Sequence, residues 1–93
     1  MPYYISEQNQ NFIFTFNGYL DDKICIQLQS QILTALKGAK NIIFDLLNVD
    51  HISSMFIHVC NLAINNVKAE NFNIINPSPN VLKVISTAGI RCD

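Results

Sequence analysis

The sequence predicts a small α/β domain in which helices pack against a mixed β-sheet. Strand-like apolar or alternating runs, apolar stripes at helical spacing, and cap and turn residues between them together predict this class. In chain order they give the pattern β-β-α-β-α-β-α. The later strand–helix–strand units imply parallel pairing of their strands. Ninety-three residues are expected to form one domain, 1–93.

The first half of the chain predicts two strands and a helix. Residues 3–7 can form a strand, and residues 11–17 alternate, with an aromatic face made by three phenylalanines. The Gly18-Tyr19 pair is expected to end that run. Asp21 is a good N-cap for a helix that closes near residues 37–38.

The second half predicts a central strand, two helices and a short strand. Residues 41–47 are nearly all apolar, as in a strand covered on both faces. A helix is expected from residue 53 to about 68, and a strand over 72–76. Ser78 as N-cap, with proline next, starts the third helix.

Composition narrows the function classes. Only 14% of residues are charged, against roughly 25% in an average soluble domain, and the net charge is −1. Without a basic stripe, nucleic acid is not an expected partner. The start of the chain lacks the features of a signal peptide and no run is long enough to span a membrane, so we expect a cytoplasmic protein.

The three cysteines indicate neither a disulfide framework nor a zinc site. They are odd in number, widely spaced and free of any C-x-x-C pair. Cys25 and Cys60 fall in helical segments and are interpreted as core or flank residues, whereas Cys92 lies in the tail. His51, His58 and Cys60 do not have zinc spacing, so no metal and no cofactor are expected.

A serine pair stands where the apolar strand meets the second helix. On a helical wheel Ser54 falls on the exposed face, with Ile57 and Ile64 at the border. The opposite stripe faces the core and comprises Phe56, Val59, Cys60, Ala63 and Val67. A serine at this place can be a plain N-cap, a nucleophile or a phosphorylation site.

Three stretches of the chain resemble STAS domains, the fold of anti-sigma factor antagonists. The run 18–21, Gly-Tyr-Leu-Asp, resembles the family's Gly-x-Leu-Asp entry to its first helix. The stretch from Asp45-Leu46 through Val49 to Ile52-Ser53-Ser54 resembles its phosphorylation turn. The junction 76–79 and the end of its helix at Ala88-Gly89-Ile90 resemble the next strand–helix unit. The resemblance covers roughly residues 3 to 90.

The resemblance implies a protein-binding switch that is not an enzyme. Ser54 matches the serine that is phosphorylated in family antagonists. The unphosphorylated antagonist binds an anti-sigma factor that is also its ATP-dependent serine kinase, phosphorylation releases it, and a phosphatase resets it. The candidate docking residues are Ser53, Met55, Ile57, His58 and Asn61. Asp21, Asp45 and Ser78 are expected to support the structure, Asp45 by bracing the turn.

Departures from the family pattern favour an alternative partner. Phe56 stands where the family usually has a glycine, Met55 replaces a small residue, and Ser53 stands where aspartate is frequent. Bulk at 55 and 56 suits a docking anchor, as in a non-phosphorylated STAS subunit of a lipid-transport ATPase complex. The family's usual final strand and helix are missing, so we expect an uncovered sheet edge or helix face and self-association.

A small hydrolase is the third class. Ser54 and His58 are four residues apart on one helix face, with Asp45 and Asp50 upstream. In known triads the nucleophile and base come from separate elements, and the Gly-x-Ser-x-Gly elbow is missing, so the spacing does not favour this class.

Overall fold

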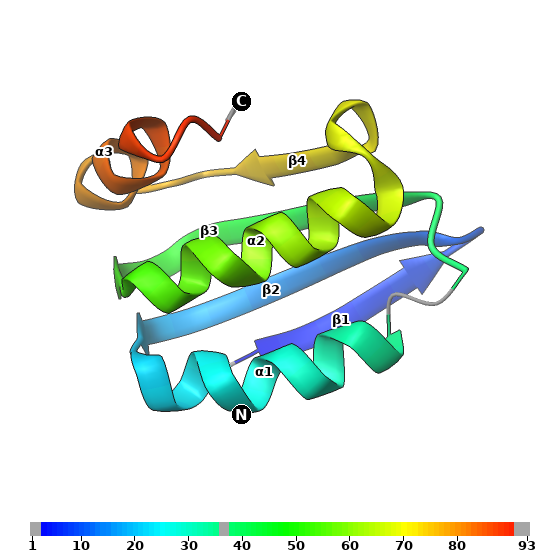
Figure 1. Cartoon of the computed structure of the whole chain (residues 1–93), viewed down its shortest axis with the longest axis horizontal. Coiled ribbons are helices and arrows are strands. Elements are labelled where there is room, and N and C mark those ends of the chain that lie inside the picture. The colour runs from blue at the N-terminus through cyan, green and yellow to red at the C-terminus, as the bar shows by residue number, and fades with distance from the viewer. Residues whose placement is uncertain (1–2, 36–37, 91–93) are drawn as a thin grey trace.

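The computed structural model describes residues 3–35 and 38–90, and its elements follow the predicted order (Figure 1). The strands are β1 (Tyr3–Gln8), β2 (Asn11–Leu20), β3 (Asn41–Ile52) and β4 (Phe72–Ile75). The helices are α1 (Asp22–Ala35), α2 (Ser54–Val67) and α3 (Pro79–Thr87), with a 3-10 turn at Ala69–Asn71 before β4.

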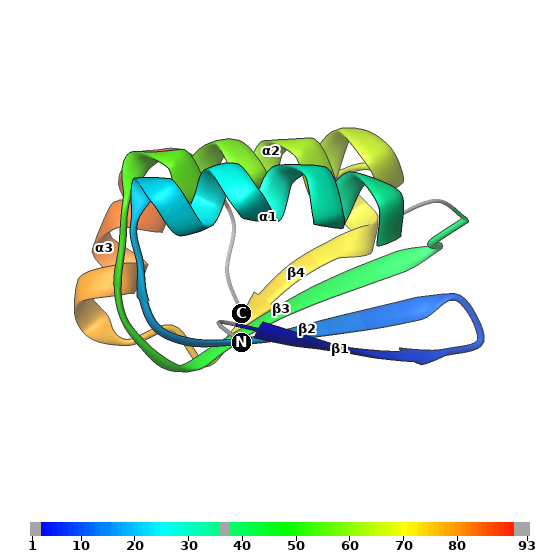
Figure 2. The same cartoon turned by 90° about the horizontal axis from the view of Figure 1, so that it is seen from below.

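The four strands form one mixed sheet in the order β1-β2-β3-β4. β1 and β2 pair antiparallel as a hairpin, whereas β2, β3 and β4 are parallel. α1 links β2 to β3 and α2 links β3 to β4, and the two helices lie side by side over one face of the sheet (Figure 2). The predicted mixed sheet with parallel strand–helix–strand units is therefore confirmed.

β2 and β3 are longer than their apolar patterns predict. The expectation that Gly18-Tyr19 ends the second strand is wrong, because β2 continues to Leu20. Gly18 adopts φ +77°, which glycine tolerates, and the pairing register with β3 shifts twice, between Thr15 and Asn17 and between Gly18 and Tyr19. Pairing between the two strands thus persists past the apolar run of β3 and brings both chain segments to the start of α2.

The core lies between the sheet and α1 and α2, and aromatic rings fill its centre. Phe16 and Phe44 meet edge to face at 5.0 Å between ring centroids, and Phe56 from α2 meets Phe16 at 5.3 Å. The predicted inward stripe of α2 is confirmed, since all five of its residues are buried: Phe56, Val59, Cys60, Ala63 and Val67. Cys25 and Cys60 are buried as predicted, while Cys92 lies outside the described residues.

β1 and β4 are the two edges of the described sheet. Self-association through an uncovered edge stays a prediction, which sedimentation at several protein concentrations would test. None of the helices in residues 3–35 and 38–90 is both long and apolar enough to cross a membrane.

Candidate functional site

The start of α2 is tied to the end of β2 through Ser53. The backbone N–H of Ser53 donates to the carbonyl oxygen of Leu20 at 2.9 Å. The Ser53 hydroxyl donates to Sγ of Cys25 at 3.8 Å, and that thiol donates to the same carbonyl at 3.7 Å. Ser53 is half-buried, so its side chain joins β2, α1 and α2 from the inside.

The Cys25 thiol at this junction stays protonated. Burial raises the pKa of Cys25 above its ordinary value, and the hydrogen bond from Ser53 partly opposes that rise. The carboxylates of Asp22 and Asp21 raise the same pKa further. A buried thiol with a raised pKa is a poor nucleophile, so Cys25 serves packing and hydrogen bonding here.

Ser54 is the first residue of α2 and its side chain is exposed, as predicted. The interpretation of Ser54 as a plain N-cap is wrong, because Ser53 occupies that position with φ −89° and ψ 169°. Ser53 makes no side-chain cap hydrogen bond, since its hydroxyl turns inward to Cys25. The Ser54 hydroxyl is therefore not used for capping.

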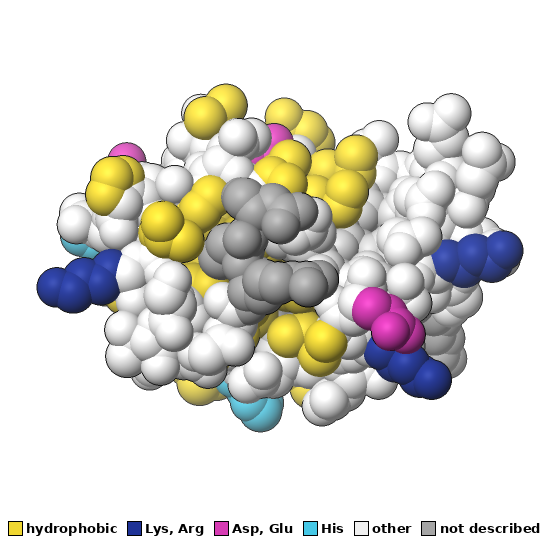
Figure 3. All heavy atoms as spheres, turned by 90° about the horizontal axis from the view of Figure 1, so that it is seen from above, with side chains coloured by type: hydrophobic (Ala, Val, Ile, Leu, Met, Phe, Trp, Pro, Cys, Tyr) yellow, Lys and Arg dark blue, Asp and Glu magenta, His cyan; other side chains and the backbone are white. Residues whose placement is uncertain are grey.

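Ser54 lies at a groove between α2 and α3. Ser54 and Ile57 line it from α2, and Lys83, Val84 and Thr87 line it from α3, with Ala88 at its end. The hollow measures about 490 Å³, and Lys83 is the only charged residue among its described lining. We call this surface the α2–α3 groove. Figure 3 views the molecule from the side of α3 and β4, where hydrophobic side chains gather.

A second hollow of about 560 Å³ continues the groove toward β4. The two hollows share Ala88, and Ile64 and Asn61 extend the α2 wall. Phe72 of β4 and Ile90, which follows α3, also line this second hollow. The two isoleucines expected at the border of α2 thus line adjoining hollows, Ile57 the α2–α3 groove and Ile64 the second hollow, which Glu70 also lines.

The other predicted docking residues divide into two sets. His58 and Asn61 are exposed on α2, and Asn61 lines the second hollow. Met55 is half-buried and packs against the core. Phe56 is fully buried, so it cannot serve as a surface anchor, and the part of the scaffold argument that used its bulk is wrong.

Sequence reasoning missed the contribution of α3 to this surface. Val84 is 40% exposed, whereas Val81 and Ile85 on the same helix are buried. Leu82 is exposed to the same extent but does not line the groove, so an extra apolar residue on α3 does not by itself mark this surface in the sequence.

The three residues predicted as structural supports all make hydrogen bonds. Oδ1 of Asp21 accepts the N–H of Ile24 at 2.8 Å, and Oγ of Ser78 accepts the N–H of Val81 at 3.4 Å. Oδ1 of Asp45 accepts the N–H of Leu47 at 3.1 Å and Nδ2 of Asn76 at 3.2 Å. Asp45 therefore links β3 to the residue after β4.

The hydrolase arrangement is not assembled around Ser54. Within the described residues, no hydrogen bond joins the Ser54 hydroxyl to His58 or to Asp45, and Asp45 is engaged with Leu47 and Asn76. The same residues contain no group of three or more histidine, cysteine, aspartate or glutamate side chains that could hold a metal ion.

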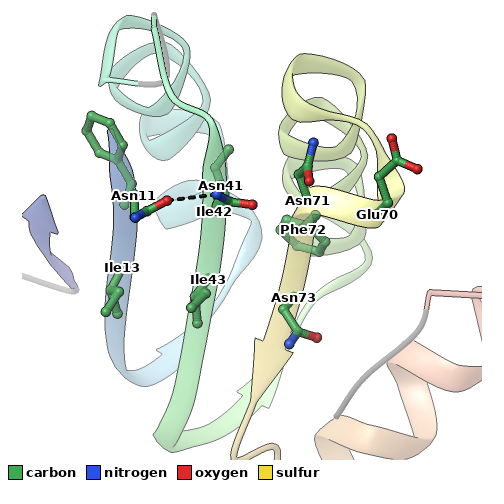
Figure 4. A pocket seen from close by; sticks show the side chains of 10 residues that line it. Asn11, Ile13, Asn41, Ile42, Ile43, Glu70, Asn71, Phe72 and Asn73 are labelled. Carbon is green, nitrogen blue, oxygen red and sulfur yellow. Dashed lines mark hydrogen bonds between the residues drawn. The ribbon is translucent and has the colours of Figure 1, made fainter. Parts of the chain in front are cut away.

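A further hollow of about 530 Å³ lies at the opposite end of the parallel strands (Figure 4). Ile13, Ile43 and Asn73 project from neighbouring strands, and the amide of Asn41 donates to Asn11 at 2.8 Å. Ser54 follows the carboxyl end of β3, whereas Asn11 and Asn41 begin their strands, so this hollow is remote from the serine turn.

Comparison with known proteins identifies a matching family and similar solved structures. The model of the STAS domain family matches residues 3–92. The unphosphorylated anti-sigma factor antagonist SpoIIAA is 20% identical, with 98% of this chain and 87% of that chain covered and a TM-score of 0.82. The phosphorylated form of SpoIIAA, the Bacillus cell fate determinant, is 19% identical, with 98% and 90% covered and a TM-score of 0.75.

An anti-sigma factor antagonist from Mycobacterium paratuberculosis is 15% identical, with 94% of this chain and 76% of that chain covered and a TM-score of 0.80. No curated protein sequence matches the chain. At these identities the likeness to solved structures concerns the fold, which agrees with the predicted architecture.

Proposed function

Because the chain belongs to the STAS domain family, we propose that it is a protein-binding switch that works as an anti-sigma factor antagonist does. In the unphosphorylated state it binds an anti-sigma factor that is also a serine kinase. Phosphorylation of Ser54 releases that partner, and a phosphatase restores the first state. The similar antagonist SpoIIAA has been solved in both phosphorylated and unphosphorylated forms, which supports the proposal.

The position of the Ser54 side chain carries the proposal: it is exposed, is not used as a cap, and borders the apolar α2–α3 groove.

In the kinase step the Ser54 hydroxyl oxygen forms a bond to the γ-phosphorus of ATP. The bond from that phosphorus to the bridging oxygen breaks, ADP leaves, and the hydroxyl proton is released. A phosphate adds roughly −1.5 to −2 charges, which makes the neighbouring apolar wall costly to desolvate in an interface.

The docking surface that we propose combines residues of both helices. Ile57, Met55, His58 and Asn61 come from α2, with Ser53 beneath the turn. Lys83, Val84 and Thr87 add the α3 wall of the groove. A small partner surface with apolar side chains and an acidic group fits this wall, because Lys83 is the one charge that it presents.

A paired pull-down from the native cell extract tests the switch. The baits are Ser54→Ala and Ser54→Asp, with Ser30→Asp on the exposed face of α1 as the charge-matched control. We expect one ATPase-fold partner on the Ala and Ser30→Asp baits and at least a tenfold lower recovery on Ser54→Asp. The three mutant domains are first checked for equal folding by circular dichroism.

Equal recovery of a partner by all three baits contradicts the switch. If that partner is a set of transporter subunits, the domain is instead a constitutive STAS subunit of a lipid-transport ATPase complex. Met55 remains the one bulky departure that supports this second function, since Phe56 is in the core.

A further inference from the structure

We propose that Lys83 on α3 binds the phosphate of phosphorylated Ser54 and draws it across the α2–α3 groove, so that the modification closes the docking surface from within the domain. The inference rests on the proposed function for its premise, that Ser54 is the phosphorylated residue. It adds a mechanism of release that depends on a residue of another helix.

The geometry of the groove places the two groups on facing walls. Ser54 lies on α2 and Lys83 on α3, and both line the same hollow of about 490 Å³. Both side chains are exposed. The lysine stem is long and flexible, and a phosphate extends the serine side chain, so the two charged groups can meet over the groove.

Lys83 is available for such a contact. Its backbone carbonyl accepts the hydroxyl of Thr87 at 2.8 Å. Its ammonium group makes no ion pair or hydrogen bond with any residue in 3–35 or 38–90. Pairing of the Lys83 ammonium group with the phosphate would therefore break no existing contact within this part of the chain.

The chemistry of the pair is favourable. A phosphate offers three acceptor oxygens and the ammonium group offers three donors. Ile57 and Val84 line the same groove, and apolar walls reduce the screening that weakens ion pairs on an open surface. No carboxylate lies among the described residues that line the hollow, so nothing there competes for Lys83.

Among the described residues, His58 is a second basic side chain close to Ser54, one helical turn later on α2. It is exposed but does not line the groove. A phosphate that paired with His58 would stay along α2 and leave the groove open. Pairing with Lys83 instead places the phosphate over Ile57 and Val84, which are the apolar atoms that a partner would contact.

The first test measures the phosphate directly and needs no partner. Phosphoserine is incorporated at position 54 during translation, and its second pKa is followed by phosphorus NMR in four proteins: the parent sequence and its Lys83→Gln, His58→Gln and Lys23→Gln variants. Lys23 is the matched control, an exposed lysine on α1. We expect the pKa to rise by roughly 0.5 in Lys83→Gln, because a nearby cation favours the charged phosphate.

The same pKa in the parent and in Lys83→Gln would overturn the proposal, and a rise in His58→Gln alone would move the contact to α2. A rise in Lys23→Gln as large as in Lys83→Gln would also overturn it, by showing a general charge effect. These outcomes hold whether or not a cell phosphorylates Ser54, so they do not depend on the proposed function.

The second test measures closure of the groove. Phosphorylated baits with and without Lys83→Gln are compared with their unphosphorylated forms in the pull-down. Because Lys83 is also part of the proposed docking surface, recovery by each phosphorylated bait is divided by recovery by its own unphosphorylated form, and this ratio should be at least threefold higher in Lys83→Gln than in the parent. A ratio that stays at the parent's level would mean that charge alone causes release. If phosphorylation changes no recovery at all, the proposed function fails while the NMR result stands.

Discussion

The starts of α1 and α3 differ from the start of α2 in how their backbone N–H groups are satisfied. Asp21 caps α1 through the N–H of Ile24, and Ser78 caps α3 through the N–H of Val81. α2 also has a serine at its N-cap position, but Ser53 turns its hydroxyl inward to Cys25. Two helix starts are thus closed by a local side chain, and the third is not.

The difference shows that packing, rather than a cap, positions the first turn of α2. Phe56 enters the core against Phe16 within that turn, and the N–H of Ser53 bonds to Leu20. The Ser54 hydroxyl is left exposed and uncommitted beside the groove. Backbone N–H groups at an uncapped helix start also favour negative charge, which is compatible with a phosphate there.

Removing the aromatic anchor of α2 should have the largest effect. Phe56→Ala should lower the free energy of unfolding by about 3–5 kcal/mol, because it removes a fully buried ring and leaves a cavity. Urea unfolding followed by circular dichroism measures this. Met55→Ala is the control: its side chain is half-buried, so its loss should be clearly smaller. Equal losses would contradict the view that packing of Phe56 positions α2.

Loss of the polar side chain at the start of the helix should destabilise the protein more at α1 than at α2. Asp21→Ala should cost about 1 kcal/mol of unfolding free energy, since the N–H of Ile24 loses its acceptor. Ser54→Ala should change stability by less than about 0.5 kcal/mol, because an exposed hydroxyl without a cap bond is lost. Asp22→Ala, the exposed neighbour, controls for charge in the first turn of α1. A Ser54→Ala loss as large as that of Asp21→Ala would restore Ser54 as a cap.

Alkaline pH should lower the stability of the folded domain, because Cys25 and Tyr3 hold their protons more tightly in the folded state. Burial raises the pKa of Cys25 above its ordinary value near 9.0, so the unfolded chain releases this proton at lower pH than the folded domain does. The Cys25 contribution to stability is therefore complete below about pH 9 and declines as pH rises through the folded pKa. Burial raises the pKa of Tyr3 as well and acts in the same direction, above its ordinary value of 10.0.

Unfolding midpoints between pH 7 and 10.5 check this expectation. Stability should fall above about pH 9, and the fall should be shallower in Cys25→Ala, which keeps the contribution of Tyr3 but loses that of Cys25. A Cys25→Ala protein with the same pH dependence as the parent would show that the thiol does not titrate differently in the folded and unfolded states.

The sequence alone predicted the order of elements, the inward stripe of α2, the exposure of Ser54 and the residues that cap α1 and α3. Each of these depends on residues a few positions apart: helical or strand period, a cap three residues before its donor, or proline at a first turn. The spacing of residues along a helix or a strand is the same wherever that element lies in the fold. A single sequence is therefore enough to identify the elements and their caps.

The tertiary structure decided what no local pattern contains. Pairing with β3 carries β2 past Gly18, and the contact between Ser53 and Cys25, 28 residues apart, leaves neither serine as a side-chain cap. Packing of α3 against β3 places Lys83 and Val84 at the groove that Ser54 borders. These contacts join residues distant in sequence, and only the packing of the sheet and helices around one core determines which of them meet.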